Sequence, residues 1–217
     1  MSNYKEKRKT IADSAKEAAV IIFSIVVAFS LDAWWEDVQV ERDVIEVLRA
    51  VESEMDENFA ALDASIEHHE LIAKSIMDLR EFGAMPDFTL EVYRSAVIEV
   101  EMFDPSTGAV DTLSATGLLS EIKDPELRLL LGSYAANLQD LNEQETRAAE
   151  FRDAARRHLA GLGMRIWDVR DRDNVVNDVE LLNLLTMRAV EEGNAVAAAQ
   201  KLRDHIRKIL ARLEETI

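Results

Sequence analysis

Apolar residues recur every three or four positions along most of this chain, which is the spacing of one face of an α-helix. Residues 36–82 form the first such stretch and contain no proline or glycine, so they predict one long helix that ends at Gly83 and Pro86. Residues 125–166 predict a second long helix. A third runs from about residue 177 to the end, with a pause at Gly193-Asn194. The clearest stripe consists of Leu127, Leu131, Tyr134, Leu138, Leu141, Glu145, Ala148, Arg152, Ala155, Leu159, Leu162 and Ile166.

Shorter helices are expected between the first two long ones, at residues 88–101 and 109–116. Gly117 can end the latter, and Asp124-Pro125 has the pattern of a helix N-cap followed by a first-turn proline. With 7 glycines and 3 prolines in 217 residues, a turn-rich β-sandwich or barrel is excluded. The fold class expected is therefore all-α: an elongated antiparallel bundle of about three long helices, with the short helices capping its far end.

The N-terminal part of the chain has a different pattern. Residues 18–31 carry no charge, and Trp34 and Trp35 follow them closely. Counted as residues 18–35, the segment is about 27 Å of helix, close to the roughly 30 Å thickness of a bilayer core. The predicted organisation is a short basic tail (1–17), a transmembrane anchor (18–35) and an acidic helical-bundle domain (36–217). The anchor continues without a break into the first long helix.

Charge gives the predicted anchor an orientation. The residues before it hold five cations, Lys16 nearest the bilayer, and residues 1–31 carry a net +2. The positive-inside rule predicts a cytoplasmic N-terminus and an extracytoplasmic body. We expect Lys16, Trp34 and Trp35 at the membrane interfaces. A cleaved signal peptide ending at Ser30 and a buried helix of a soluble protein are the two alternatives.

The composition excludes several kinds of partner and chemistry. The net charge is −17, which makes nucleic acid an unsuitable partner, and the absence of cysteine rules out disulfides and thiolate chemistry. Residues 67–70 read Glu-His-His-Glu, but the sequence lacks the His-x-x-x-His and Glu-x-x-His spacings of helical metal sites. It also lacks a phosphate-binding glycine loop and a nucleophile elbow. No catalytic, cofactor or metal site is expected, and the solvated face of a helix, with His69 at a packed seam, accounts for residues 67–70.

Two stretches of the chain carry a family resemblance. One runs from VIIFSIVVAFSLDAWWEDV to the end of an acidic helix near Asn58; the other is DTLSATGLLSEIKDPELRLLLGSYAANL. In this order they resemble an uncharacterised bacterial family of single-pass, membrane-anchored helical proteins. The resemblance covers roughly a third of the chain. It implies a place in the bacterial inner membrane and a helical body, and no established activity.

The best position for function is the irregular segment 104–128, expected at the membrane-distal tip of the bundle. Its alternative role is simply to turn the chain. The candidate interaction residues are Asp104, Pro105, Ser106, Thr107, Gly117, Asp124 and Pro125.

The leading hypothesis is a non-enzymatic, membrane-anchored interaction or scaffold protein whose partners are the lipid bilayer and other proteins or a second copy of itself. The alternative is an extracytoplasmic bundle that senses a ligand. If residues 45–80 and 127–166 pair in antiparallel register, Glu52 and Arg152 meet and form a structural ion pair.

Overall fold

The computed structural model describes residues 2–81, 90–100, 102–163 and 177–217. In helices α1 and α2 the side chains of residues 2–20, 80–81 and 90–93 lie outside the described part. All regular elements of the described part are helical, which confirms the all-α prediction. They are α1 (Ser2–Glu81), α2 (Leu90–Val97), α3 (Gly108–Thr116), the 3₁₀ helix η1 (Leu118–Glu121), α4 (Pro125–Gly161) and α6 (Val179–Thr216).

The chain divides into two compact units, residues 1–46 and residues 47–217, and α1 contributes to both. The first unit is the N-terminal part of α1. Its side chains from Ile21 to Trp35 include a run of large apolar groups that are between 39% and 70% exposed. Within the helices whose side chains are described, none combines the length and apolar character that crossing a bilayer requires. The predicted span begins at Ala18, three residues before the first described side chain.

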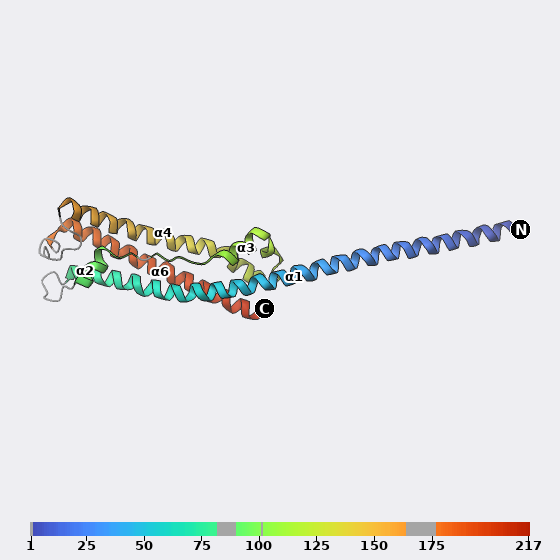
Figure 1. Ribbon diagram of the computed structural model, residues 1–217, viewed down its shortest axis with the longest axis horizontal. Coiled ribbons are helices and arrows are strands. Elements are labelled where there is room, and N and C mark those ends of the chain that lie inside the picture. The colour runs from blue at the N-terminus through green and yellow to red at the C-terminus, as the bar shows by residue number, and fades with distance from the viewer. Residues whose placement is uncertain (1, 82–89, 101, 164–176) are drawn as a thin grey trace. The chain divides into compact units, whose positions relative to one another are not determined.

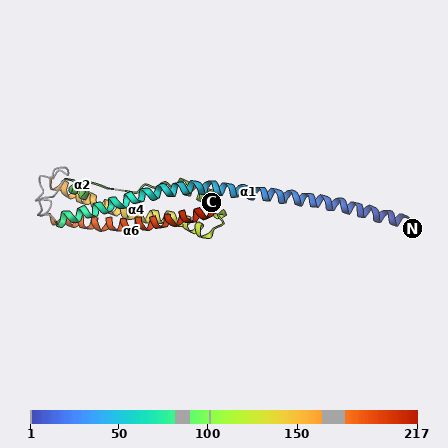
Figure 2. The same cartoon turned by 90° about the horizontal axis from the view of Figure 1, so that it is seen from below.

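The second unit is a bundle of α4, α6 and the part of α1 from Val47 onward (Figure 1). Helices α4 and α6 lie side by side in both views and run antiparallel (Figure 2). Two ion pairs fix their register, Lys201 with Asp140 at 2.9 Å and Arg212 with Asp124 at 2.6 Å. The predicted helix pause at Gly193 is wrong, since α6 runs through it.

Helices α1 and α4 run parallel, so the predicted antiparallel register of these two helices is wrong. Asn58 bonds Tyr134 and His69 bonds Glu145, and both pairs are separated by 76 residues. A constant difference between partner numbers means that the two helices advance in the same direction. Helix α6 is antiparallel to both, as the α1 to α6 contacts of Asp63 with Arg203 and His69 with Glu192 also require.

Parallel neighbours need a connection that returns along the bundle. Residues 98–100 and 102–107, here called the return segment, are the described part of that connection. The segment starts at the end of α2, beside the last turns of α1, and reaches α3 at the opposite end of the bundle (Figure 1). The backbone N–H of Phe103 donates to Glu145, and both backbone polar atoms of Ser106 bond the Asn58 side chain. The short helices 88–117 therefore do not form one cap at the far end, because α2 and α3 lie at opposite ends of this unit.

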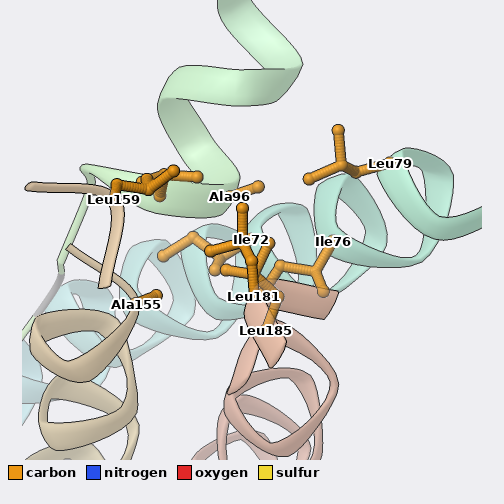
Figure 3. Packing of buried hydrophobic residues seen from close by; sticks show 9 residues of the cluster. Ile72, Ile76, Leu79, Ala96, Ala155, Leu159, Leu181 and Leu185 are labelled. Atoms are coloured by element: carbon orange, nitrogen blue, oxygen red, sulfur yellow. The ribbon is translucent and has the colours of Figure 1, made fainter. Parts of the chain in front are cut away.

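The seams of the bundle follow the predicted three-and-four spacing. On α1 the buried positions from Leu48 to Leu79 lie three or four residues apart, except for the adjacent buried pairs at 54–55, 65–66 and 75–76. On α4 most of the predicted stripe is buried. Near the end of α1, one apolar cluster joins four helices (Figure 3). Its members are Ile72, Ile76 and Leu79 of α1, Ala96 and Val97 of α2, Ala155 and Leu159 of α4, and Leu181 and Leu185 of α6.

The predicted helix ends in the middle of the chain are confirmed. Gly117 ends α3 with φ of 79°, in the left-handed region that favours glycine. The Asp124 carboxylate accepts a hydrogen bond from the backbone N–H of Glu126, and Pro125 opens α4. The predicted end of the first helix at Gly83 and Pro86 and the polar loop at residues 170–174 lie outside the described residues.

Candidate functional site

His69 lies in the middle of the bundle and is bonded on both sides of its ring. Its Nδ1 is 2.6 Å from Glu192 Oε2, and its Nε2 is 3.2 Å from Glu145 Oε1. The side chain is 1% exposed. An ionised carboxylate can only accept, so these contacts require a proton on each ring nitrogen. Burial by itself lowers the pKa of His69, but the hydrogen bonds to Glu145 and Glu192 outweigh burial and raise the pKa to about 9.

Arg188 of α6 is fully buried beside this histidine. Its Nε donates to Glu192 Oε1 at 2.9 Å, one helical turn further along α6. One terminal nitrogen donates to the carbonyl of Ala96 at 2.8 Å, and the other to the carbonyl of Glu99 at 2.5 Å. Burial lowers the pKa of Arg188 and the charge of Glu192 opposes this effect. The Arg188 guanidinium therefore links α6 to the C-terminal end of α2 and to the residues that follow it.

Glu145 completes the arrangement from α4. Its Oε1 accepts from the His69 ring and from the backbone N–H of Phe103 at 3.0 Å. We call His69, Glu145, Arg188 and Glu192 the charged cluster. It contains two cations and two anions, so its net charge is zero, and every member is at most 3% exposed. Loss of one member leaves a buried charge without its partner, which costs about 3–5 kcal/mol in comparable pairs.

The charged cluster is closed to solvent, and its contacts hold segments of the chain together. Among the residues that the structure describes, no group of three or more His, Asp or Glu side chains is arranged to hold a metal ion. The predicted burial of His69 at a packed seam is confirmed. Its neighbour His68 is partly exposed.

A second group, the Asn58 cluster, joins three buried side chains to the exposed Ser106 at the other end of the return segment. It comprises Glu54, Asn58, Ser106 and Tyr134. Glu54 accepts from the backbone N–H groups of Ala109 at 2.8 Å and Val110 at 3.4 Å, so a side chain of α1 satisfies the first donors of α3. Burial raises the pKa of the Tyr134 hydroxyl, which accepts from Asn58 at 2.9 Å. This cluster couples α1, α3 and α4.

Most of the candidate interaction residues have structural partners. Asn58 binds the backbone of Ser106, Thr107 Oγ1 donates to Asp111, and Gly117 and Asp124 terminate helices. Burial acts to raise the pKa of Asp124, but the hydrogen bond and charge of Arg212 and the backbone N–H groups of Glu126 and Leu127 together outweigh it, so the pKa is lowered. Asp104 is exposed and Pro105 is partly exposed. These residues lie level with Glu54 and Asn58, near the start of the second unit's portion of α1, and not at the end of α1 as predicted.

The structure does not bring Glu52 and Arg152 together. The parallel register places residue 52 level with residue 128, about 24 residues or 36 Å of helix from residue 152. Arg152 instead bonds the neighbouring Asp153 at 2.8 Å. The predicted ion pair fails because it depended on the antiparallel register.

Trp34 and Trp35 are 60% and 50% exposed, and Lys16 is among the residues whose side chains are not described.

In the second unit, a shallow hollow opens between α4 and α6, where Lys201 bonds Asp140 across its rim. It is lined by Asp140, Gln144, Asn194, Ala197, Ala198 and Lys201. The ligand-sensing alternative stays a prediction.

Sequence reasoning placed His69 and Glu145 in the helix stripes but did not predict that they meet. His69 and Glu145 stand out as polar residues in apolar stripes, which is the signal that identifies them. Arg188 and Glu192 were missed because an Arg-Glu pair four residues apart is typical of a solvated helix face.

No family model, curated protein or solved structure matches this chain.

Proposed function

We propose that this protein is a non-enzymatic interaction protein anchored in a bilayer through residues 18–35, with its basic tail in the cytoplasm and its acidic bundle outside. The observation that carries the proposal is the exposure of consecutive large apolar side chains around the whole circumference of α1. Ile21, Ile22 and Phe23 are 59%, 62% and 69% exposed although successive helix residues point about 100° apart.

A helix that is apolar on every side is stable when protein or lipid surrounds it. The exposed series continues through Phe29 and Leu31 to Trp34 and Trp35, the aromatic pair that suits a membrane interface. With the uncharged residues 18–20 it makes a segment of bilayer length. The resemblance to single-pass bacterial proteins agrees with this and stays a prediction.

The interaction role is supported by the state of the polar groups in the bundle. The charged cluster and the Asn58 cluster link the long helices to one another and to the return segment. An acidic bundle that shares a helix with a lipid anchor suits the presentation of a surface to a protein partner or to a second copy.

Membrane fractionation and topology reporters test the proposal. The protein should stay with membranes after alkaline carbonate extraction, and alkaline phosphatase fused after Ile217 should be active. Changing Ile22, Val26 and Phe29 together to Lys should release the protein, whereas Leu71→Lys, at a residue 51% exposed on the bundle, should not. An active cytoplasmic reporter after Ile217, or a mature N-terminus at Leu31, contradicts the proposal.

A further inference from the structure

The charged cluster fastens the chain between α2 and α3 to the long helices through backbone atoms. Arg188 binds the carbonyls of Ala96 and Glu99, and Glu145 binds the N–H of Phe103. His69 stands between the two carboxylates, so it links the group that holds Phe103 to the group that holds Arg188.

We propose that the charged cluster is a proton-dependent latch: the doubly protonated His69 ring holds the return segment on the bundle, and loss of one ring proton releases the backbone of Glu99 and Phe103 from it.

The geometry explains why a single proton matters. After deprotonation one ring nitrogen presents a lone pair to a carboxylate oxygen 2.6 or 3.2 Å away, which replaces a charge-assisted hydrogen bond by a repulsion. The cluster then has a net charge of −1 in a place closed to water, which is strongly unfavourable. A carboxylate reaches solvent by turning away from His69, and that movement breaks its bond to Phe103 or to Arg188.

The groups that face the cluster leave His69 as the titrating member. From α4 they are Glu145 and Arg152, from α6 Arg188 and Glu192, and from the start of the return segment Glu99, which also receives a hydrogen bond from Ser95 at 2.8 Å. Carboxyl and guanidinium groups ordinarily titrate outside the range from pH 7 to 10, whereas the pKa of His69 is raised to about 9, inside it.

The release is local because both ends of the return segment are held independently. At one end, Ala96 and Val97 pack with Ile72 and Ile76 in the apolar cluster of Figure 3. At the other end, Asn58 is hydrogen-bonded to the backbone of Ser106. The three long helices keep their own buried seams. Local openings of this kind need less free energy than global unfolding.

Distance measurements between paired nitroxide labels on the full-length protein in detergent micelles test the latch. The chain has no cysteine, so Leu71→Cys with Met102→Cys, both exposed, labels α1 and the return segment specifically. Arg147→Cys with Gln200→Cys, also exposed, reports on α4 and α6 as the reference pair. We expect the first pair to gain a second distance population that grows about tenfold from pH 8 to pH 10, while the reference pair stays constant.

His69→Gln should remove this pH dependence, and His205→Gln, a matched change elsewhere in the bundle, should keep it. If His69→Gln does not fold, Glu145→Gln provides the test: with one counter-ion fewer, opening should begin at a lower pH. A constant first pair up to pH 10, an unchanged pH response in His69→Gln, an unshifted onset in Glu145→Gln, or equal broadening of both label pairs overturns the latch.

Discussion

Asn58 binds both backbone polar atoms of Ser106: its Nδ2 donates to the Ser106 carbonyl at 2.7 Å, and its Oδ1 accepts from the Ser106 N–H at 2.9 Å. The Asn58 side chain therefore makes the two backbone hydrogen bonds to Ser106 that a neighbouring strand would make in a β-sheet. The same Nδ2 donates to the Tyr134 hydroxyl, so α4 is part of the arrangement.

Asn58→Leu should lower the free energy of unfolding by about 2–4 kcal/mol, because it removes both partners of the Ser106 backbone in a partly buried place and keeps the side-chain volume. Urea denaturation followed by circular dichroism measures the change. Asn194→Leu, at an exposed position on α6, should stay within about 0.5 kcal/mol of the parent protein. Equal effects of the two substitutions would show that the contact with Ser106 contributes nothing.

The free energy of unfolding should depend on pH through His69. Its folded-state pKa, about 9, is above the ordinary value of 6.5, so its stabilisation is complete below pH 6.5 and is lost as the pH rises through about 9. The linkage amounts to about 3 kcal/mol between pH 6 and pH 10. Urea titrations across this range should show the decline in the parent protein and in His158→Gln. A curve for His69→Gln that declines as steeply would exclude this origin.

Arg188→Met should destabilise the bundle by about 3–5 kcal/mol, since it leaves Glu192 buried without its guanidinium partner. The double variant with Glu192→Met removes one charge of each sign and should lose less than the sum of the two single changes. Arg207→Ala breaks an exposed pair with Asp204 and should cost less than about 1 kcal/mol. Additive losses within the buried pair would show that the two side chains are not coupled.

Alanine substitutions at two glycines should change the stability of the bundle in opposite directions. Gly117→Ala should destabilise by about 1–2 kcal/mol because its φ of 79° strains any residue with a Cβ, even though there is open space around it. Gly193→Ala, in open space inside α6, should stabilise by about 0.5–1 kcal/mol because alanine is the better helix former. Thermal unfolding of both variants gives the signs; the same sign for both would contradict this reading of α6 and of the turn at Gly117.

The apolar spacing was enough to predict the long helices and much of the core, because burial of one face imposes the same period on any bundle. The helix ends at Gly117 and Asp124 followed from a different signal, the glycine itself and the Asp-Pro pair. The apolar spacing does not predict whether two helices pair in parallel or antiparallel, because a stripe of apolar residues has the same period in both directions. The return segment makes the parallel arrangement of α1 and α4 possible, and Asn58 and Glu145 bind it through its backbone. Backbone recognition leaves no mark in the side chains of the segment that is bound, so sequence reasoning could not find it.

The constant separation of 76 residues between partners on α1 and α4 has a consequence for synthesis of the protein. At about 5–20 residues per second, each position on α1 leaves the ribosome roughly 4–15 seconds before its partner on α4 exists. Its contacts on α6, Arg203 for Asp63 among them, follow later still. The buried face from Leu48 to Leu79 is therefore exposed on the nascent chain for seconds. Helices α4 and α6, which are neighbours in sequence, are synthesised after it.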